Sequence, residues 1–176
     1  MPVDTTEVIK AIDSLKPKTS HGQDRITNRL LKYVKQETAW PLSQIINQTF
    51  QSGVFPHSMK IAKVIPLFKE KEKNLLCNYR PVSVLSSVSK VFEKIMHNQI
   101  YEHFNSLNIL YPNQYGFRKN HSTEYAAMEL VERIIREMDK NSTPINIFMD
   151  LSKAFDTLDH KILFHKLNIM VSEVHH

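Results

Sequence analysis

Glycine is scarce in this chain of 176 residues, with only three copies. Neither GxxxxGKS/T nor GxGxxG occurs, which excludes the glycine-rich phosphate-binding loops. Cys77 is the only cysteine, so an internal disulfide and a cysteine-built zinc site are excluded, and a reducing compartment fits. No apolar run approaches the roughly 20 residues of a membrane-spanning helix, and the N-terminus has no signal-peptide pattern. We therefore expect an intracellular protein without a membrane partner, and the sequence does not distinguish nucleus from cytoplasm.

The composition is that of a soluble globular protein. The apolar fraction is 41% and the charged fraction 23%, and the length is sufficient for one domain with a real core. Lysine plus arginine number 23 against 18 acidic residues, which gives a net charge of +5. This mild excess suits a nucleic-acid partner without establishing one.

Hydrophobic periodicity predicts a mainly helical chain with a small antiparallel sheet, an α+β fold. Strands are predicted at 61–68, with Pro66 marking an edge, and at 78–85. Pro41 is expected in a first helical turn and Gly53 just past a helix end. The helices are predicted at 4–15, 26–36, 38–52, 87 to about 107, and 122 to about 140, with a last one starting near 156.

A carboxylate follows the last predicted strand. Ile145, Ile147, Phe148 and Met149 form a short apolar run, and Asp150 stands where it ends. A carboxylate at the end of a buried strand is costly unless it is hydrogen-bonded or holds a cation. Asp156 is instead predicted to cap the following helix, with Asp159 three residues on. Asp150 is therefore the better candidate for chemistry.

Four blocks in this chain resemble the reverse transcriptase domain of non-LTR (LINE-like) retrotransposons, particularly the jockey and CR1-like groups. Their order and spacing agree over roughly residues 5–170. The blocks are Lys63-Val-Ile-Pro66 with Lys69; Asn78-Tyr-Arg-Pro-Val-Ser83 with Lys90-Val-Phe-Glu-Lys94; Pro112-Asn-Gln-Tyr-Gly-Phe-Arg118 with Ser122-Thr123; and Phe148-Met-Asp-Leu-Ser-Lys-Ala-Phe-Asp-Thr-Leu-Asp-His160 with Leu163 and Lys166-Leu167.

The resemblance implies RNA-templated DNA synthesis in a right-hand polymerase fold, with an RNA template, a DNA primer and dNTPs as partners. Two Mg²⁺ or Mn²⁺ ions would orient the attacking hydroxyl and stabilise the leaving pyrophosphate. Asp150 is implied as the catalytic metal ligand. The backbone of Leu151, Ser152, Lys153 and Ala154 would run beside the incoming triphosphate, and the Phe155 ring would exclude a 2′-hydroxyl.

Basic residues complete the implied site. Lys69 and Arg80 would face the triphosphate, because a guanidinium fork and an ammonium both suit phosphate oxygens. Lys63 and Arg118 would contact template or nucleotide. The implied organisation is an N-terminal helical extension (1–58), fingers (59–143) and the start of a palm (144–176).

One family feature is absent. Family polymerases carry a second acidic block, Tyr/Phe-x-Asp-Asp, and no two acidic residues are adjacent anywhere in this chain. One carboxylate cannot hold two cations. We therefore expect a truncated fingers-and-first-palm fragment that binds metal poorly and is inactive alone. A separate chain or a continuation supplying the second half stays open, and the strand before Asp150 would lack a neighbour and expose apolar area.

Three other readings are open. A zinc site built from the nine histidines is disfavoured, because no HExxH spacing occurs. A non-catalytic fragment could bind nucleic acid, or interfere with a complete polymerase, through Lys63, Lys69, Arg80 and Arg118. Tyr79 and Phe117 would then offer stacking surfaces. The fragment could also be an unselected relic.

The missing acidic block predicts the outcome of a primer-extension assay. With Mg²⁺ or Mn²⁺ and an RNA template, the purified chain should extend a DNA primer no further than its Asp150→Ala variant does. Extension above that control would contradict the expectation of inactivity.

Overall fold

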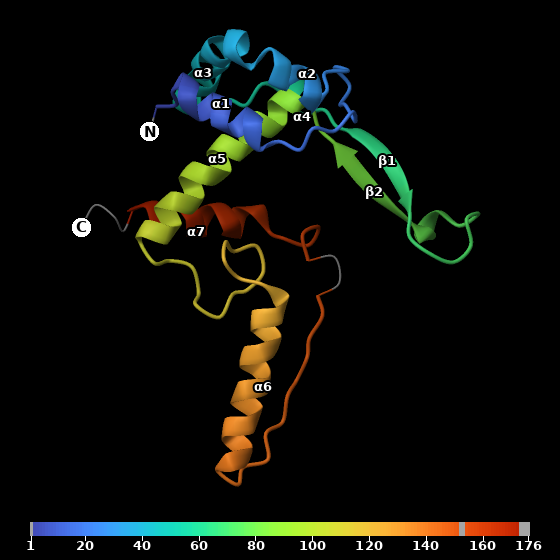
Figure 1. Cartoon of the computed structure of the whole chain (residues 1–176), viewed down its shortest axis with the longest axis vertical. Helices are drawn as coiled ribbons and strands as arrows, with labels where there is room; N and C mark the ends of the chain where they lie inside the picture. The colour runs from blue at the N-terminus through green and yellow to red at the C-terminus, as the bar shows by residue number, and fades with distance from the viewer. Residues whose placement is uncertain (1, 152–153, 173–176) are drawn as a thin grey trace. The chain divides into compact units, whose positions relative to one another are not determined.

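The computed structural model describes residues 2–151 and 154–172, and about half of the chain is helical. The helices and strands in chain order are α1 (Thr5–Ser14), α2 (Asn28–Tyr33), α3 (Lys35–Ser52), α4 (His57–Lys60), β1 (Lys63–Phe68), the 3-10 turn η1 (Leu76–Asn78), β2 (Tyr79–Val84), α5 (Ser87–Ser106), α6 (Thr123–Asp139) and α7 (His160–Ser172) (Figure 1). The predicted combination of many helices with a small antiparallel sheet is confirmed.

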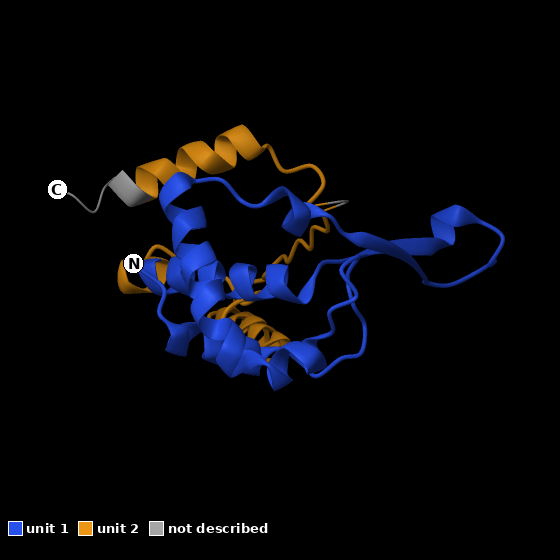
Figure 2. Ribbon diagram, turned by 90° about the horizontal axis from the view of Figure 1, so that it is seen from above, with its two compact units in different colours: residues 1–103 blue, residues 104–176 orange. Residues whose placement is uncertain are grey.

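The chain divides into two compact units, residues 1–103 and 104–176 (Figure 2). None of the helices in the described part of the chain combines the length and apolar character needed to cross a membrane.

The core of the first unit lies where α1, α3 and the start of α5 pack together. Phe92 is 1% exposed and its ring meets Phe55 edge to face, with centroids 5.7 Å apart. Fully buried aromatic rings and aliphatic side chains of this kind each stabilise a fold by roughly 1.5–3 kcal/mol. The buried apolar residues are Val3, Val8, Ala11, Ile12, Leu31, Ala39, Leu42, Ile46, Val91, Phe92 and Ile95.

Local sequence signals explain most helix ends. The Asp4 carboxylate accepts a hydrogen bond from the Glu7 amide at 2.7 Å, and the Thr27 hydroxyl accepts one from the Leu30 amide at 3.1 Å. Gly53 ends α3 with φ +67°, a left-handed conformation that glycine adopts without a Cβ penalty. Ser122 caps α6, and its hydrogen bond to the Glu124 carboxylate lowers the pKa of that group.

Three predicted features differ in the structure. Because α3 begins at Lys35, Pro41 lies in its second turn and not in its first. Asp159 caps α7 in place of Asp156: its Oδ1 accepts from the Lys161 amide at 2.8 Å. Residues 145–149 form no strand, since no strand in the described ranges pairs with them.

A buried polar junction ties the loop after α1 to the start of α5. The Ser87 hydroxyl, fully buried, lies 2.8 Å from both the Ile26 carbonyl oxygen and Asn28 Oδ1. Asn28 also donates its side-chain amide to the Lys16 carbonyl at 2.9 Å. The loop approaches so closely that a Cβ on Gly22 would lie 2.8 Å from the Ser86 backbone nitrogen. Only glycine fits that approach.

Gly22→Ala should therefore destabilise the first unit by roughly 1–3 kcal/mol, because backbone atoms and not a flexible side chain must move. Urea unfolding followed by the fluorescence of Trp40, the only tryptophan, measures it. Gly116→Ala is the control, since no atom beyond Gly116 and its two chain neighbours lies within 4 Å of the added methyl group. Equal stability of both variants would contradict the close approach.

Candidate phosphate-binding hairpin and the Asp150 segment

Strands β1 and β2 form a hairpin that extends away from the helices of the first unit (Figures 1 and 2). They pair antiparallel, with Lys63 opposite Val84, Leu67 opposite Arg80 and Phe68 opposite Tyr79. The Lys69 amide donates to the Asn78 carbonyl at 2.9 Å, which continues the pairing by one more step. The two predicted strands are confirmed as an antiparallel pair, with bounds Lys63–Phe68 and Tyr79–Val84.

The register places three predicted basic residues on one face of this hairpin. Side chains alternate along a strand, and directly opposed residues point to the same face. Lys63, Leu67 and Lys69 are separated by even numbers of residues, so their side chains point to the same face of the hairpin. Arg80 is directly opposed to Leu67 and therefore shares that face. We call the surface of Lys63, Ile65, Leu67, Lys69, Arg80 and Val82 the basic face. Its cations are exposed to solvent.

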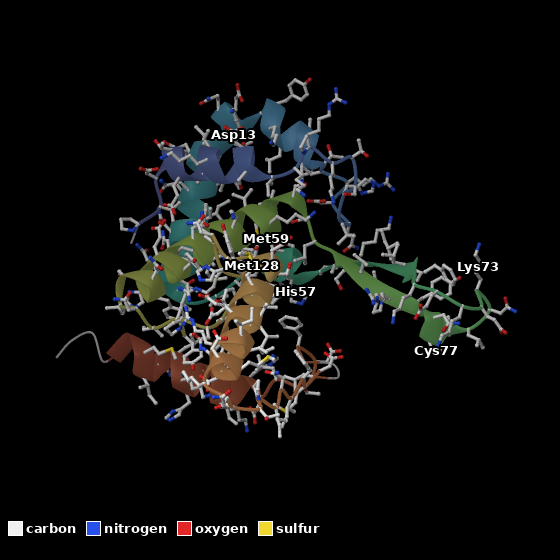
Figure 3. The ribbon with its side chains drawn as sticks, turned by 60° about the horizontal axis from the view of Figure 1, so that its bottom comes forward. Asp13, His57, Met59, Lys73, Cys77 and Met128 are labelled. Carbon is white, nitrogen blue, oxygen red and sulfur yellow. The ribbon has the colours of Figure 1, made fainter. Side chains whose placement is uncertain are left out.

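The opposite face is occupied by the hairpin's own loop. Phe68 and Tyr79 meet edge to face with centroids 5.5 Å apart, and Lys73 Nζ lies 5.8 Å from the centre of the Phe68 ring. The Tyr79 hydroxyl donates to the Lys73 carbonyl at 3.0 Å, and Asn78 Nδ2 donates to the Glu72 carbonyl at 2.7 Å. Figure 3 shows Lys73 and the exposed Cys77 in this loop. The contacts of Phe68, Tyr79 and Lys73 lie on this face, whereas Asn78, directly opposed to Lys69, contacts the loop from the basic face.

Two prolines protect the hairpin edges. Because Lys69 and Asn78 are a hydrogen-bonded pair and such pairs alternate, Pro66 and Pro81 form a pair without ladder hydrogen bonds. The backbone nitrogens of such a pair point outward, where proline has no N–H to offer a further strand. The prolines therefore cost the hairpin no ladder bond and disfavour strand addition on either edge, which confirms the edge reading of Pro66.

The electrostatics of the basic face favour an anion. Lys69 Nζ lies 3.6 Å from Glu70 Oε1, but both side chains are about half exposed, and such a pair contributes about 0–1 kcal/mol. No hydrogen bond or ion pair engages the Lys63 ammonium or the Arg80 guanidinium within the part of the chain that the structure describes. Lys69 and Arg80 occupy diagonal positions on the two paired segments, and such positions are about 7–8 Å apart in an antiparallel pair. Together they can contact neighbouring phosphate groups.

The Asp150 segment belongs to the second unit. Asp150 is exposed, and the preceding Ile145, Phe148 and Met149 are 80–87% exposed. Leu151 and Ala154 are exposed as well, whereas Ser152 and Lys153 lie outside the described residues. Asp150 therefore lies exposed to solvent in a segment without secondary structure.

The donor set around Asp150 does not suffice for a two-cation site. No group of three or more His, Cys, Asp or Glu residues is close enough to hold a metal ion among residues 2–151 and 154–172. Hard divalent cations take several oxygen ligands, and two of them need carboxylates from more than one place.

Two aromatic residues of the resemblance blocks meet in the second unit. Phe117 and Phe155 contact edge to face with centroids 6.0 Å apart, although both rings are more than three-quarters exposed. Phe117 has φ +63°, and residues 112–118 form turns. The contact joins the Tyr-Gly-Phe-Arg block to the block that contains Asp150.

Arg118 is held by backbone. Its Nη1 donates to the Tyr111 carbonyl at 2.9 Å, and its Nε is buried. A template or nucleotide contact by Arg118 stays a prediction, and the Tyr111 carbonyl would compete with a phosphate for the guanidinium.

Comparison with known proteins identifies relatives of the chain. A family model described as "Reverse transcriptase (RNA-dependent DNA polymerase)" matches residues 69–173. The "Probable RNA-directed DNA polymerase from transposon BS" of Drosophila melanogaster is 32% identical over 167 residues, which are 94% of this chain and 18% of that protein. The "RNA-directed DNA polymerase from mobile element jockey" of Drosophila funebris is 28% identical over 172 residues, 97% of this chain and 19% of that protein. The chain thus spans about a fifth of these curated relatives.

Replacing the two carboxylates near α7, Asp156 and Asp159, should affect the stability of that helix differently. Asp159→Ala removes the acceptor for the Lys161 and Ile162 amides and should cost α7 about 1 kcal/mol. Asp156→Ala, a matched control with no such bond to the helix start, should leave α7 unchanged. Amide hydrogen exchange of residues 161–165 measures both, and faster exchange in the Asp156 variant alone would show that the cap is misassigned.

Proposed function

Since the chain belongs to the reverse transcriptase (RNA-dependent DNA polymerase) family, we propose that it is the fingers and the start of the palm of a longer polymerase of the jockey type. The parent reaction is RNA-templated DNA synthesis from dNTPs on a DNA primer. Residues 1–58 form an N-terminal helical extension, 59–143 the fingers and 144–176 the opening of a right-hand palm. The relatives with the printed name RNA-directed DNA polymerase support this proposal.

The observation that carries the proposal is the shared face of Lys63, Lys69 and Arg80. In the proposed polymerase, this basic face of the hairpin contacts the triphosphate of the incoming dNTP, with Lys63 farther from the loop and nearer the template. The guanidinium fork of Arg80 supplies two parallel donors and Lys69 an exchangeable point charge. Ile65, Leu67 and Val82 between them exclude water from one side of the bound phosphates.

The Asp150 segment has the second part of the proposed role. Enzymes of this family generally use divalent cations, and Asp150 is proposed as one ligand in the complete polymerase, where further carboxylates join it. Leu151 to Ala154, including Ser152 and Lys153, would line the triphosphate with backbone amides. Phe155 would bound the sugar pocket, since a ring below C2′ leaves no room for a hydroxyl.

A non-catalytic function is the second candidate. The exposed cations of the hairpin and the absence of a metal-binding group among the described residues favour binding without catalysis by this chain alone. Binding that falls steeply with salt, without primer extension, would be its signature.

Arg80→Gln should weaken the binding of dTTP to the full chain about 10-fold or more, because charge-assisted hydrogen bonds contribute about 1.5–3 kcal/mol each. Equilibrium dialysis at fixed ionic strength measures the affinity. Lys73→Gln is the matched control, since it removes one charge from the same hairpin but from the face beside Phe68.

The proposal predicts a large loss for Arg80→Gln and near-native affinity for Lys73→Gln. Equal losses in the two variants would mean that net charge alone attracts the nucleotide. No loss in either would remove the basic face from the site.

A further inference from the structure

A lysine or arginine three residues before a serine or threonine occurs five times in this chain. One class of protein serine/threonine kinases recognises a cation in that position, because carboxylates in the peptide groove of the kinase pair with it. The five pairs are Lys16 and Thr19, Lys35 and Thr38, Arg80 and Ser83, Lys119 and Ser122, and Lys140 and Thr143. The structure separates these candidates, because a kinase binds its acceptor in an extended, accessible segment.

Three of the hydroxyl groups belong to regular secondary structure. Thr38 lies in α3, where its hydroxyl donates to the Val34 carbonyl at 2.7 Å. Ser83 lies within β2, and its backbone is part of the pairing with β1. The Ser122 hydroxyl accepts from the Tyr125 amide at 3.2 Å and caps α6. A kinase would have to unfold each of these elements before it could reach the acceptor.

The fourth candidate, Thr143, is exposed and lies outside the helices and strands. The cation before it is already engaged, since Lys140 Nζ lies 2.7 Å from Glu137 Oε1. Asp139 adds a second carboxylate just before Lys140. The acidic groups of a kinase groove would repel these two carboxylates, which disfavours Thr143.

The fifth candidate, Thr19, meets both requirements. Residues 16–20 are all exposed and form no helix or strand, and they extend from three positions before the acceptor to one after it. Across the ranges that the structure describes, no hydrogen bond or ion pair engages the Thr19 hydroxyl or the ammonium groups of Lys16 and Lys18. The acceptor and two cations are therefore all available to a partner.

This segment is also held in place at both ends. Asn28 Nδ2 donates to the Lys16 carbonyl at 2.9 Å, and Gly22 lies so close to the Ser86 backbone that a Cβ would not fit. Pro17 has a fixed φ and biases Lys16 towards an extended backbone. A segment that is already restrained loses less conformational entropy when it enters a binding groove.

We propose that Thr19 is a phosphorylation site for a serine/threonine kinase that recognises a basic residue three positions before its acceptor. The Thr19 hydroxyl oxygen attacks the γ-phosphorus of ATP held by that kinase, and the bond between this phosphorus and the leaving ADP oxygen breaks. The hydroxyl proton passes to the catalytic aspartate of the kinase. The products are ADP and phosphothreonine 19, and the site is independent of the proposed polymerase role.

The modification would change the charge of the most basic part of the chain. Residues 16–35 contain six lysines and arginines and one aspartate, and this excess of five equals the net charge of the whole chain. A phosphate group carries about −1.5 to −2 charges at pH 7 and would offset about a third of that excess. Phosphorylation would therefore lower the positive potential around the loop between α1 and α2.

The test incubates the folded full chain with Mg²⁺, ATP and the catalytic subunit of cyclic-AMP-dependent protein kinase. Tandem mass spectrometry locates the phosphate, and the initial rate of incorporation is measured. Thr19 should be the fastest site, and Thr19→Ala should remove most of the incorporation. Lys16→Gln should lower the rate about 10-fold or more, because charge-assisted hydrogen bonds contribute about 1.5–3 kcal/mol. Lys140→Gln, which removes the cation from the same pattern before Thr143, is the matched control and should leave the rate unchanged.

Three results would overturn the proposal. The first is no incorporation into the folded chain. The second is phosphate that appears faster at Ser20 or at any of the other four acceptors than at Thr19. The third is equal rates for Lys16→Gln and the native chain, which would show that the cation three positions before Thr19 is not recognised.

Discussion

The buried hydroxyl of Ser87 is the interaction on which the first unit depends. It lies within hydrogen-bonding distance of the Ile26 carbonyl and the Asn28 side chain at the point where β2 has just ended and α5 begins. A buried polar group of this kind costs about 1–3 kcal/mol if its partner is lost, so the junction tolerates few alternatives. Because Gly22 approaches the backbone at the neighbouring Ser86, the loop after α1 is fixed against the base of the hairpin. This junction fixes the base of the hairpin on which the proposed basic face lies.

The second unit is organised differently. Helix α6 has no buried residue, and the segment before Asp150 displays large apolar side chains to solvent. A single extended segment gains no stability without a neighbouring strand, since its backbone groups and its apolar face both need partners. Asp150 can serve as a metal ligand only where further carboxylates are supplied, and the same additional chain segments would cover this apolar surface.

Local signals in the sequence predicted much of the fold. The remaining features depend on which segments of the chain pair with one another. The Gly53 stop and the two strands of the hairpin were predicted from neighbouring residues, and the structure confirms them, whereas the caps at Asp4 and Thr27 were found only in the structure. Asp156 and Asp159 offer nearly the same capping signal, and only the backbone of α7 distinguishes them. The run 145–149 has a strand composition, but a strand also requires a partner that composition does not reveal. Family resemblance selected Lys63, Lys69 and Arg80 individually, whereas their shared face depends on the register.

The most direct measurement of the central claim is an NMR titration of the full chain with dTTP that follows the Nε–H signal of Arg80. The account predicts that this signal and the Lys69 amide shift together, while the Tyr79 hydroxyl keeps its hydrogen bond to the Lys73 carbonyl on the other face. Shifts confined to Lys73 and its neighbours in the loop, with Arg80 unmoved, would contradict it.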